Sequence, residues 1–224
     1  MSLLYLIYPE LANNDSECHL PIWTDQESPW SILSSKGDDA IITQIHNLII
    51  NFDNDIGKNN NYSFDTSDGP IYIHPSAKIG DYVRIEGPCF IGRNAEIRHS
   101  AYLRKGSWIC KNSIVGHSSE IKNSVLLPGA KAPHFNYVGD SILGFNVNIG
   151  AGVKLSNVRN DRRNILVSIQ NGERKDTGLR KFGALIGDDC EIGCNVVSNP
   201  GTILEPNTMI SPNETLNGWI KKNN

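Results

Sequence analysis

The sequence predicts an all-β fold, a parallel β-helix of stacked coils. Three observations predict it: aliphatic residues recur every six positions, small residues recur with the same period, and glycines follow several of the aliphatic sites. A helix would repeat its apolar residues every three or four positions, and a simple strand every second position. A period of six is the hexapeptide repeat of a parallel β-helix, in which three repeats close one triangular coil.

The aliphatic series occupies ten consecutive sites that we expect to point into the coil. These sites are Ile73, Ile79, Ile85, Ile91, Ile97, Leu103, Ile109, Val115, Ile121 and Leu127. The small series occupies nine sites near the corners, namely Ala77, Val83, Cys89, Ala95, Ala101, Ser107, Ser113, Ser119 and Val125. Because each coil pairs with the coils above and below it, one repeat alone is unstable and many are needed.

The register returns twice further along the chain. One aliphatic series is Leu143, Ile149 and Leu155, with Val147 and Val153 as small partners. The other is Ile186, Ile192, Leu204 and Ile210, with Ser198 in the same series and Cys190, Val196, Thr202 and Thr208 as small partners. Roughly six coils over residues 71–212 result. Cys89 and Cys190 occupy interior sites, so we assign them no chemistry.

Residues 1–70 predict a small helical lead-in. The apolar run from Leu3 to Ile7 indicates a short strand or packing segment. Ser28 offers an N-cap, and Pro29 then stands at the first position of a short helix. Gly37 ends that helix.

A second helix is predicted over residues 39–52, capped by Asp38 or Asp39. Its apolar residues have helical spacing and are Ile41, Ile42, Ile45, Leu48, Ile49 and Phe52. Residues 53–70 are polar and rich in turn formers, which indicates a linker or surface loop. The helix and the tail over residues 213–224 are candidates to cover the open end of the coil stack against edge pairing.

The composition excludes several classes of protein. The chain has 224 residues, a net charge of −3 and five cysteines in no disulfide framework. This charge gives no indication of nucleic-acid binding, and the cysteines indicate reduced thiols in a cytoplasm. No Cys/His cluster suggests structural zinc. No run approaches the ~20 apolar residues of a membrane span or has the form of a signal peptide, so we expect a cytoplasmic protein.

Two segments interrupt the six-residue register, at residues 128–140 and 156–184. Loops that leave a rigid scaffold often carry function, and the first interruption presents a single histidine, His134. In the second, apolar residues alternate before Asn171-Gly172, which is a strong hairpin turn signal. We therefore expect the second interruption to be an ordered β-hairpin.

The second interruption is also basic. Residues 157–181 carry a net charge of +4, so the rest of the chain carries −7. The basic residues are Arg159, Arg162, Arg163, Arg174, Lys175, Arg180 and Lys181. A basic excursion on an acidic body suggests a phosphorylated ligand. A solvated loop that needs charge to stay soluble is the other interpretation.

The stretch HFNYVGDSILGFNVNIGAG, residues 134–152, resembles the C-terminal domain of the bifunctional UDP-N-acetylglucosamine pyrophosphorylase/glucosamine-1-phosphate acetyltransferases. SNVRND and DTGLRKFGALIGD resemble archaeal sugar-1-phosphate nucleotidylyltransferases with an acetyltransferase tail, and their short bacterial relatives. This resemblance, over about residues 71–212, implies a left-handed coil, acetyl-CoA as co-substrate and a homotrimer with His134 facing the next subunit. Residues 1–70 hold no glycine-rich phosphate loop, so we expect no pyrophosphorylase activity.

The resemblance also implies roles for single residues. His134 matches the general base. The substrate-binding positions are Arg104, Lys122, Tyr137, Asn148 and Asn157, and Ala151 matches an alanine whose backbone meets the acetyl donor. From the basic segment we add Arg163 for the substrate and Lys181 for acetyl-CoA. Val158 stands where bacterial relatives have a tyrosine, so the substrate can differ from theirs.

These residue types fit acetyl transfer to an amino-sugar phosphate such as glucosamine 1-phosphate. A histidine with a pKa of about 6.5 can remove the proton that blocks an amino group from attack. The amine then attacks the thioester, and a backbone N–H at Ala151 can hold the developing oxyanion. Because the coil interior has no room for imidazole, we expect the break at residues 128–140 to place His134 outside the repeat.

Other functions stay open at this point. The chain could be a non-catalytic trimeric protein that binds a sugar phosphate or sugar nucleotide. His99, His117 and His134 follow one another at about one coil each and could bind zinc, as in a γ-carbonic anhydrase, but the HxxxxH pattern of that group is absent. We therefore expect no metal. His134 could also make one structural hydrogen bond, and Arg104 and Lys122 could be solvated cations on one edge of the coil.

Overall fold

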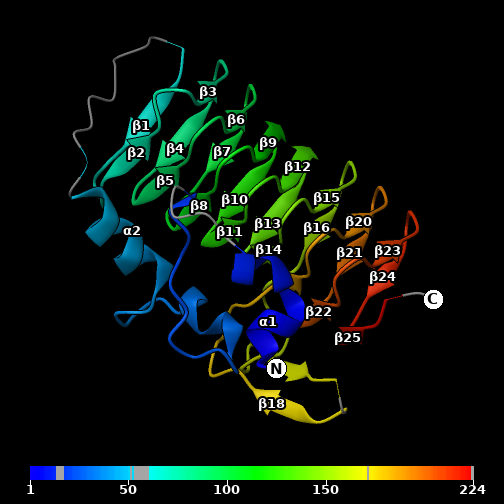
Figure 1. Cartoon of the computed structure of the whole chain (residues 1–224). Helices are drawn as coiled ribbons and strands as arrows, with labels where there is room; N and C mark the ends of the chain where they lie inside the picture. The colour runs from blue at the N-terminus through cyan, green and yellow to red at the C-terminus, as the bar shows by residue number, and fades with distance from the viewer. Residues whose placement is uncertain (14–17, 51, 53–60, 171, 223–224) are drawn as a thin grey trace.

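The computed structural model describes residues 1–13, 18–50, 52, 61–170 and 172–222. Three parallel sheets wind along one axis and form the three sides of a prism (Figure 1). The chain visits sheets A, B and C in turn, so each strand pairs with strands of the coils before and after it. The prediction of an all-β parallel β-helix is confirmed.

The strands are short and stack in register along each side. Sheet A consists of β1 (Ser63–Asp65), β4 (Arg84–Glu86), β7 (Tyr102–Leu103), β10 (Glu120–Lys122), β13 (Tyr137–Gly139), β16 (Lys154–Leu155), β21 (Val197–Ser198) and β24 (Thr215–Leu216). Sheet B consists of β2 (Ile71–Ile73), β5 (Cys89–Ile91), β8 (Ser107–Ile109), β11 (Ser124–Leu126), β14 (Ile142–Leu143), β19 (Ala184–Ile186), β22 (Thr202–Leu204) and β25 (Trp219–Ile220). Sheet C consists of β3 (Lys78–Ile79), β6 (Glu96–Ile97), β9 (Ile114–His117), β12 (Lys131–His134), β15 (Asn148–Ile149), β20 (Glu191–Ile192) and β23 (Met209–Ile210).

The interior is filled by the aliphatic residues that the six-residue period identifies. In sheet A, Leu103 pairs with Ile85 on one side and Ile121 on the other, and all three are fully buried. Cys89 and Cys190 belong to the same interior core. The stacked side chains supply the apolar burial that holds the coils together.

The register differs from the prediction between residues 122 and 143. Leu126, and not Leu127, pairs with Ile109 and lies in the interior core. Val125 and Leu127 instead belong to the cluster outside the coil. The corner from sheet A to sheet B is therefore a residue shorter than the six-residue count requires in two successive coils, after Ile121 and again after Val138.

This shift removes the expected interruption at residues 128–140. Strands β12 and β13 continue sheets C and A, and His134 pairs with His117 of the preceding coil. The idea that the coil breaks open to present His134 was wrong. The histidine stays outside the core because it lies at the end of β12, where the chain turns the corner toward sheet A.

The coil extends beyond residues 71–212 at both ends. Strand β1 pairs with β4, so residues 63–65 belong to the coil and not to a linker. Strands β24 and β25 likewise extend the stack into the predicted tail. Sheets A and B each contain eight strands. Because each coil adds one strand to each sheet, the stack is longer than the roughly six coils expected.

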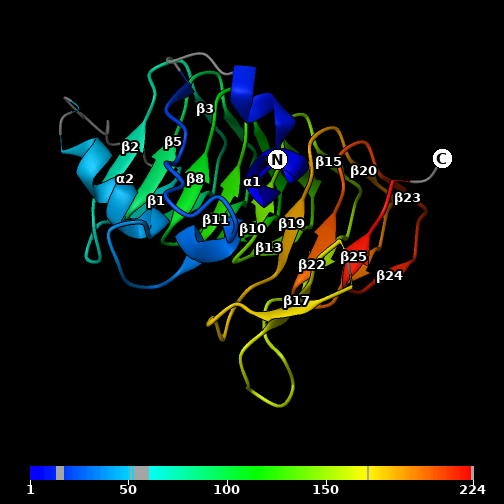
Figure 2. The ribbon, with the colours of Figure 1, turned by 60° about the horizontal axis from the view of Figure 1, so that its bottom comes forward.

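The N-terminal region packs across the outer face of sheet B (Figures 1 and 2). It consists of α1 (Leu3–Ile7), the 3-10 helices η1 (Pro9–Asn13) and η3 (Pro29–Leu33), and α2 (Ile41–Ile49). The outward residues of sheet B in the apolar cluster that it shares are Tyr72, Phe90, Trp108, Val125, Ile142, Leu185 and Ile203. The described residues of the N-terminal region therefore serve to bury an apolar side of the coil.

Several expectations for this region need correction. The run from Leu3 to Ile7 is a helix and not a strand. Pro29 does begin a short helix, but neither Ser28 nor the residue before α2, Ala40, makes a side-chain cap. Helix α2 lies against β5, on a side of the prism, so it does not cover the open end. The helix covers the side of the prism and not its open end, because the outer face of sheet B is a continuous apolar strip that would otherwise be exposed to water.

Aromatic rings form the centre of this contact. Tyr72 and Phe90 stack with ring centroids 5.3 Å apart, and Trp108 follows at 5.5 Å from Phe90. The Trp108 indole N–H donates to the carbonyl of His19 at 2.9 Å, which satisfies its one polar atom. Such buried rings contribute strongly to stability through their large area.

Asp188 anchors helix α1 at the corner between sheets B and C. Its carboxylate accepts hydrogen bonds from the backbone N–H groups of Glu10 at 3.0 Å and Phe145 at 2.8 Å. Its own N–H donates to the carbonyl of Ile7 at 3.2 Å. Burial raises the pKa of Asp188 to about 7 despite these two donors, so part of the population is neutral at neutral pH.

All five cysteines are free, and Cys194 alone of them is exposed. Within the described part of the chain, no helix has the length and apolar character needed to cross a membrane.

We expect Phe90→Ala to lower the free energy of unfolding by about 3–5 kcal/mol, because it leaves a cavity in the middle of the aromatic contact. Tyr82→Ala is the matched control, since Tyr82 is 78% exposed and its loss should change stability by no more than about 0.5 kcal/mol. Urea denaturation of both variants measures the difference. Equal losses would contradict the burial of sheet B by the N-terminal region.

Candidate functional site

The second interruption leaves the coil between β16 and β19, at the corner where sheet A gives way to sheet B. It contains the antiparallel pair β17 (Leu166–Ser168) and β18 (Arg174–Asp176), so the predicted hairpin is confirmed. Asn171 of its predicted turn lies outside the described residues. We call residues 156–184 the excursion.

The excursion packs on the N-terminal region, as Figure 2 shows. Lys175 Nζ donates to Ser28 Oγ at 2.8 Å and lies 5.3 Å from the centre of the Trp30 ring. The Phe182 ring also lies beside Trp30, with centroids 6.1 Å apart. These contacts place two segments from outside the repeat against one corner of the coil.

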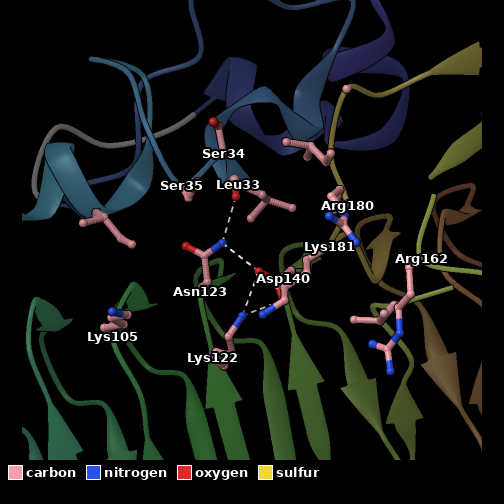
Figure 3. A pocket seen from close by; sticks show the side chains of 14 residues that line it. Leu33, Ser34, Ser35, Lys105, Lys122, Asn123, Asp140, Arg162, Arg180 and Lys181 are labelled. Atoms are coloured by element: carbon pink, nitrogen blue, oxygen red, sulfur yellow. Dashed lines mark hydrogen bonds and ion pairs between the residues drawn. The ribbon is translucent and has the colours of Figure 1, made fainter. Parts of the chain in front are cut away.

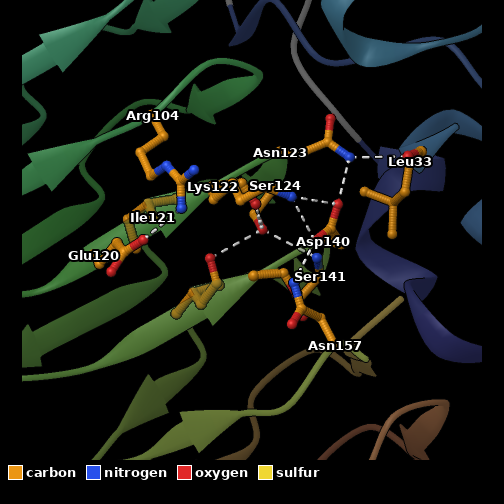
Figure 4. A network of polar contacts seen from close by, with 12 residues as sticks. Leu33, Arg104, Glu120, Ile121, Lys122, Asn123, Ser124, Asp140, Ser141 and Asn157 are labelled. Atoms are coloured by element: carbon orange, nitrogen blue, oxygen red, sulfur yellow. Dashed lines mark hydrogen bonds and ion pairs between the residues drawn. The ribbon is translucent and has the colours of Figure 1, made fainter. Parts of the chain in front are cut away.

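A buried carboxylate, Asp140, occupies this corner (Figure 4). Lys122 Nζ donates to its two oxygens at 3.0 and 2.8 Å. Asn123 Nδ2 donates to Oδ1 at 2.9 Å, and Asn157 Nδ2 donates to Oδ2. The side chains of Asp140 and Lys122 are only 4% and 14% exposed, so the pair is shielded from water and both charges depend on each other.

The same cluster connects the coil, the N-terminal region and the excursion. Asn123 Nδ2 also donates to the carbonyl of Leu33 in the N-terminal region, at 2.8 Å. The Asp140 carbonyl accepts from Gly183 N–H at 2.8 Å, where the excursion rejoins the coil. One corner of the coil therefore fixes both added segments.

The outer face of sheet A carries a row of polar residues next to this cluster. Arg104 pairs with Glu120 at 2.9 Å, and the hydrogen bond that its guanidinium donates to this carboxylate raises the pKa of Arg104. Leu103 pairs with Ile121, so Arg104 and Lys122 occupy neighbouring positions, as predicted. Each already has an acidic partner, so neither is simply a solvated cation.

Tyr137 and Asn157 lean toward each other over Gly139 on this face. A Cβ added at Gly139 would lie 2.6 Å from Tyr137 Oη and 2.8 Å from Asn157 Nδ2. Burial, with the nearby carboxylates of Asp140 and Glu120, raises the pKa of Tyr137. Its hydroxyl thus stays protonated and can donate a hydrogen bond.

His134 lies at the opposite end of the sheet A strands, at the corner with sheet C. The side chain is exposed, and its ring has no hydrogen-bond partner among the residues described. The backbone N–H donates to Asn136 Oδ1 at 2.9 Å, which fixes the main chain below the imidazole. The adjacent Ala151 turn is held by a hydrogen bond of 3.0 Å from Gly152 N–H to the His134 carbonyl.

The remaining predicted residues are spread over other surfaces. Asn148 is on sheet C and donates to Glu191 at 3.0 Å. Arg163 pairs with Asp161 at 2.8 Å and is 77% exposed. Lys181, assigned to the acetyl donor, instead lines a cavity together with Lys122, which was assigned to the substrate.

That cavity, of about 600 Å³, lies at the corner of sheets A and B (Figure 3). The N-terminal region forms one wall through residues 33–35 and Ile42, and the excursion forms another through residues 178–181. We call it the corner cavity. Five cations line it, and they are Lys105, Lys122, Arg162, Arg180 and Lys181.

Sequence reasoning missed Asp140 and Asn123. Asp140 stands inside the motif quoted for the resemblance, between a predicted strand and Ser141. A carboxylate needs hydrogen-bonding or charged partners when it is buried. Its partner Asn123 directly follows Lys122, so the adjacent lysine was a usable signal. The register shift hid both, because it disguised where the corner falls.

The structure does not bring the histidines together as metal ligands. His99 and His117 stack face to face with ring centroids 4.1 Å apart. Among the described residues, no group of three or more His, Cys, Asp or Glu side chains is placed to hold a metal ion.

A double-mutant cycle tests the Lys122–Asp140 pair. Asp140→Asn or Lys122→Met alone should each lower the free energy of unfolding by about 3–5 kcal/mol, because each leaves a buried charge unpaired. The double variant should lose less than the sum, with a coupling of about 1–3 kcal/mol in urea denaturation.

The exposed pair of Arg84 and Asp65, 2.8 Å apart, is the matched control. The coupling of Arg84→Met with Asp65→Asn should stay below about 1 kcal/mol. Additive losses at Lys122 and Asp140 would contradict the interdependence of the buried pair.

Comparison with known proteins adds to this picture. The family model described as the GMPPB C-terminal domain matches residues 85–220. The bifunctional protein GlmU of Methanococcus aeolicus is 34% identical over 200 residues, covering 89% of this chain and 46% of the relative. A bifunctional sugar-1-phosphate nucleotidylyltransferase/acetyltransferase of Sulfurisphaera tokodaii is 34% identical over 168 residues, covering 67% of this chain and 42% of the relative. Among solved structures, the polySia-specific acetyltransferase NeuO aligns with a TM-score of 0.45 at 14% identity, covering 73% of this chain and 81% of that one.

The chain thus spans about half the length of the curated relatives it matches. The resemblance to the C-terminal domain of such bifunctional proteins, drawn from the motifs at residues 134–152 and 156–188, is confirmed. Since the family model covers more than half of the chain, the protein belongs to the family described as the GMPPB C-terminal domain.

Proposed function

We propose that the protein is an acetyl-CoA-dependent N-acetyltransferase that acts on an amino-sugar phosphate such as glucosamine 1-phosphate. The name of the Sulfurisphaera tokodaii relative, a bifunctional sugar-1-phosphate nucleotidylyltransferase/acetyltransferase, supports an acetyltransferase of the sugar-phosphate class. The observation that carries the proposal is the contact between His134 and the Ala151 turn, made by the 3.0 Å hydrogen bond from Gly152 N–H. An exposed base and a turn with backbone donors are thereby neighbours on one corner.

The chemistry assigns separate tasks to these two neighbours. Neutral His134 takes a proton from the ammonium group of the sugar. The free amine forms a bond to the acetyl carbonyl carbon, and the thioester bond then breaks to release the thiol form of coenzyme A. We assign Ala151 N–H, which has no acceptor among the described residues, to stabilising the oxyanion of the intermediate.

We assign the sugar phosphate to the polar face of sheet A. Arg104 keeps free N–H groups after it pairs with Glu120, because a guanidinium has five donors. We assign the protonated hydroxyl of Tyr137 and the amide of Asn157 to binding the sugar hydroxyls. Asn148 and Arg163 are assigned to the substrate from neighbouring surfaces, and acetyl-CoA is assigned to the Ala151 turn.

We further propose that the protein is a cytoplasmic homotrimer. In such an assembly the exposed imidazole of His134 faces a neighbouring subunit, which supplies the orienting partner that a single chain lacks.

The first test is release of free thiol from acetyl-CoA in the presence of glucosamine 1-phosphate. We expect His134→Ala to lower kcat/KM by about 10²–10⁴-fold, the usual contribution of a general base. His99→Ala is the matched control, because His99 occupies the equivalent corner two coils away, and it should retain activity.

Equal activity of the wild type and His134→Ala would contradict the role of His134. If neither protein releases thiol with several amino-sugar phosphates while both still bind them, the proposed function fails, and the protein is a non-catalytic sugar-phosphate binding protein.

A further inference from the structure

Asp188 joins the first residues of the chain to the coil. Its Oδ2 accepts the backbone N–H of Glu10 at 3.0 Å, and its own N–H donates to the carbonyl of Ile7 at 3.2 Å. Its Oδ1 accepts the N–H of Phe145, a residue of the coil, at 2.8 Å. One side chain therefore holds the end of α1 and the beginning of η1 against the corner between sheets B and C.

The Asp188 carboxylate is buried without a cation. Its exposed fraction is 0%, and none of the ion pairs among the described residues includes it. Burial is the main cause that raises its pKa, and the carboxylates of Asp189 in the coil and Glu10 in the N-terminal region raise it further. Ionised Asp188 thus lies among like charges, with two backbone N–H groups to compensate for the water that it has lost.

Two other titratable side chains face Asp188, and both stay uncharged near neutral pH. Burial raises the pKa of Tyr8 well above its usual value, and the hydroxyl of Tyr8 donates to the carbonyl of Ile142 at 3.3 Å. Burial also raises the pKa of the Cys190 thiol to about 12. Of these three buried groups at the contact between α1 and the coil, Asp188 is therefore the one whose charge changes around neutrality.

We propose that Asp188 is a proton-operated latch, in which the neutral carboxyl holds residues 3–13 on the coil and the loss of its proton loosens them. When the segment detaches, the carboxyl meets water and returns to a pKa of about 3.9. In the docked state its pKa is about 7. Because the docked state binds the proton more tightly, docking is strongest at low pH and weakens as the pH rises toward 7 and beyond.

The latch controls an apolar surface. Ile7 and Tyr8 belong to the same buried cluster as Ile142 and Leu185 of sheet B, so detachment of residues 3–13 exposes part of the apolar side of the coil. The latch lies at the corner between sheets B and C, whereas His134 lies at the corner between sheets C and A. The inference therefore does not depend on acetyl transfer.

Hydrogen–deuterium exchange of the full chain at about pH 6 and about pH 8 tests the latch. Protection factors, which are corrected for the intrinsic pH dependence of exchange, are compared for Leu6 and Tyr8, whose N–H groups bond within α1. The two pKa values of Asp188 predict that protection there falls about tenfold between these pH values. Protection in β6, which lies on sheet C, should stay unchanged.

Asp188→Asn keeps a neutral side chain at both pH values, so its protection at residues 3–13 should not depend on pH. Asp189→Asn is the matched control, since it removes the adjacent exposed carboxylate and should keep the response of the wild type. A nuclear magnetic resonance titration of the Asp188 carboxyl carbon in the wild type needs no variant, and its midpoint should lie near neutrality.

Three results would overturn the proposal. One is a carboxyl midpoint near the usual value for aspartate, and another is equal protection of residues 3–13 at both pH values in the wild type. The third is an equal fall in protection in β6, which would show that Asp188 acts on global unfolding and not on this segment. If Asp188→Asn does not fold, the two wild-type measurements still decide.

Discussion

The burial of the Asp140 carboxylate is the constraint on which the rest of the structure depends. A carboxylate at 4% exposure is costly unless it is paired and hydrogen-bonded. Lys122 supplies the charge, and Asn123 and Asn157 supply donors. Each partner then has a fixed position, and through the partners the carboxylate fixes segments far apart in the sequence.

The coil and its additions have different physical tasks. The stacked aliphatic interior makes a rigid prism, because each strand is paired on both sides. The N-terminal region buries an apolar side of that prism, and the excursion packs against the N-terminal region through Lys175 and Trp30. Functional groups therefore gather at corners, where the prism meets solvent or an added segment.

The two corners of sheet A differ in chemistry. One presents His134 and the Ala151 turn, which suit proton removal and stabilisation of an oxyanion. The other presents Arg162, Arg180 and Lys181 around the corner cavity, with no acidic partner among the described residues. Strand β13 of sheet A links the two corners.

The period of six residues predicts the sheets and the interior because core packing repeats with the backbone. The six-residue count failed at Leu126, because a corner can lose one residue without disturbing the stack. A count of fixed period then assigns Val125 and Leu127 to the interior, although both lie outside the coil.

The apolar stripe of the second helix predicts packing on the flank of the coil, which is confirmed. Which of the three sides it covers could not be predicted, because such a stripe fits any apolar surface. A local motif assigns roles to His134 and Tyr137 from the sequence, and these roles stay predictions. The site was not predictable at Asp140, whose importance comes from partners that only the folded corner brings together.

Hydrogen–deuterium exchange on the wild type and Asp140→Asn tests the central claim most directly. If the Asp140 corner fixes both added segments, the variant loses protection at residues 33–36 and at Phe182 and Gly183 together, while strands of sheet C such as β6 keep theirs. Unchanged protection at these segments, or an equal loss throughout the coil, would contradict the account.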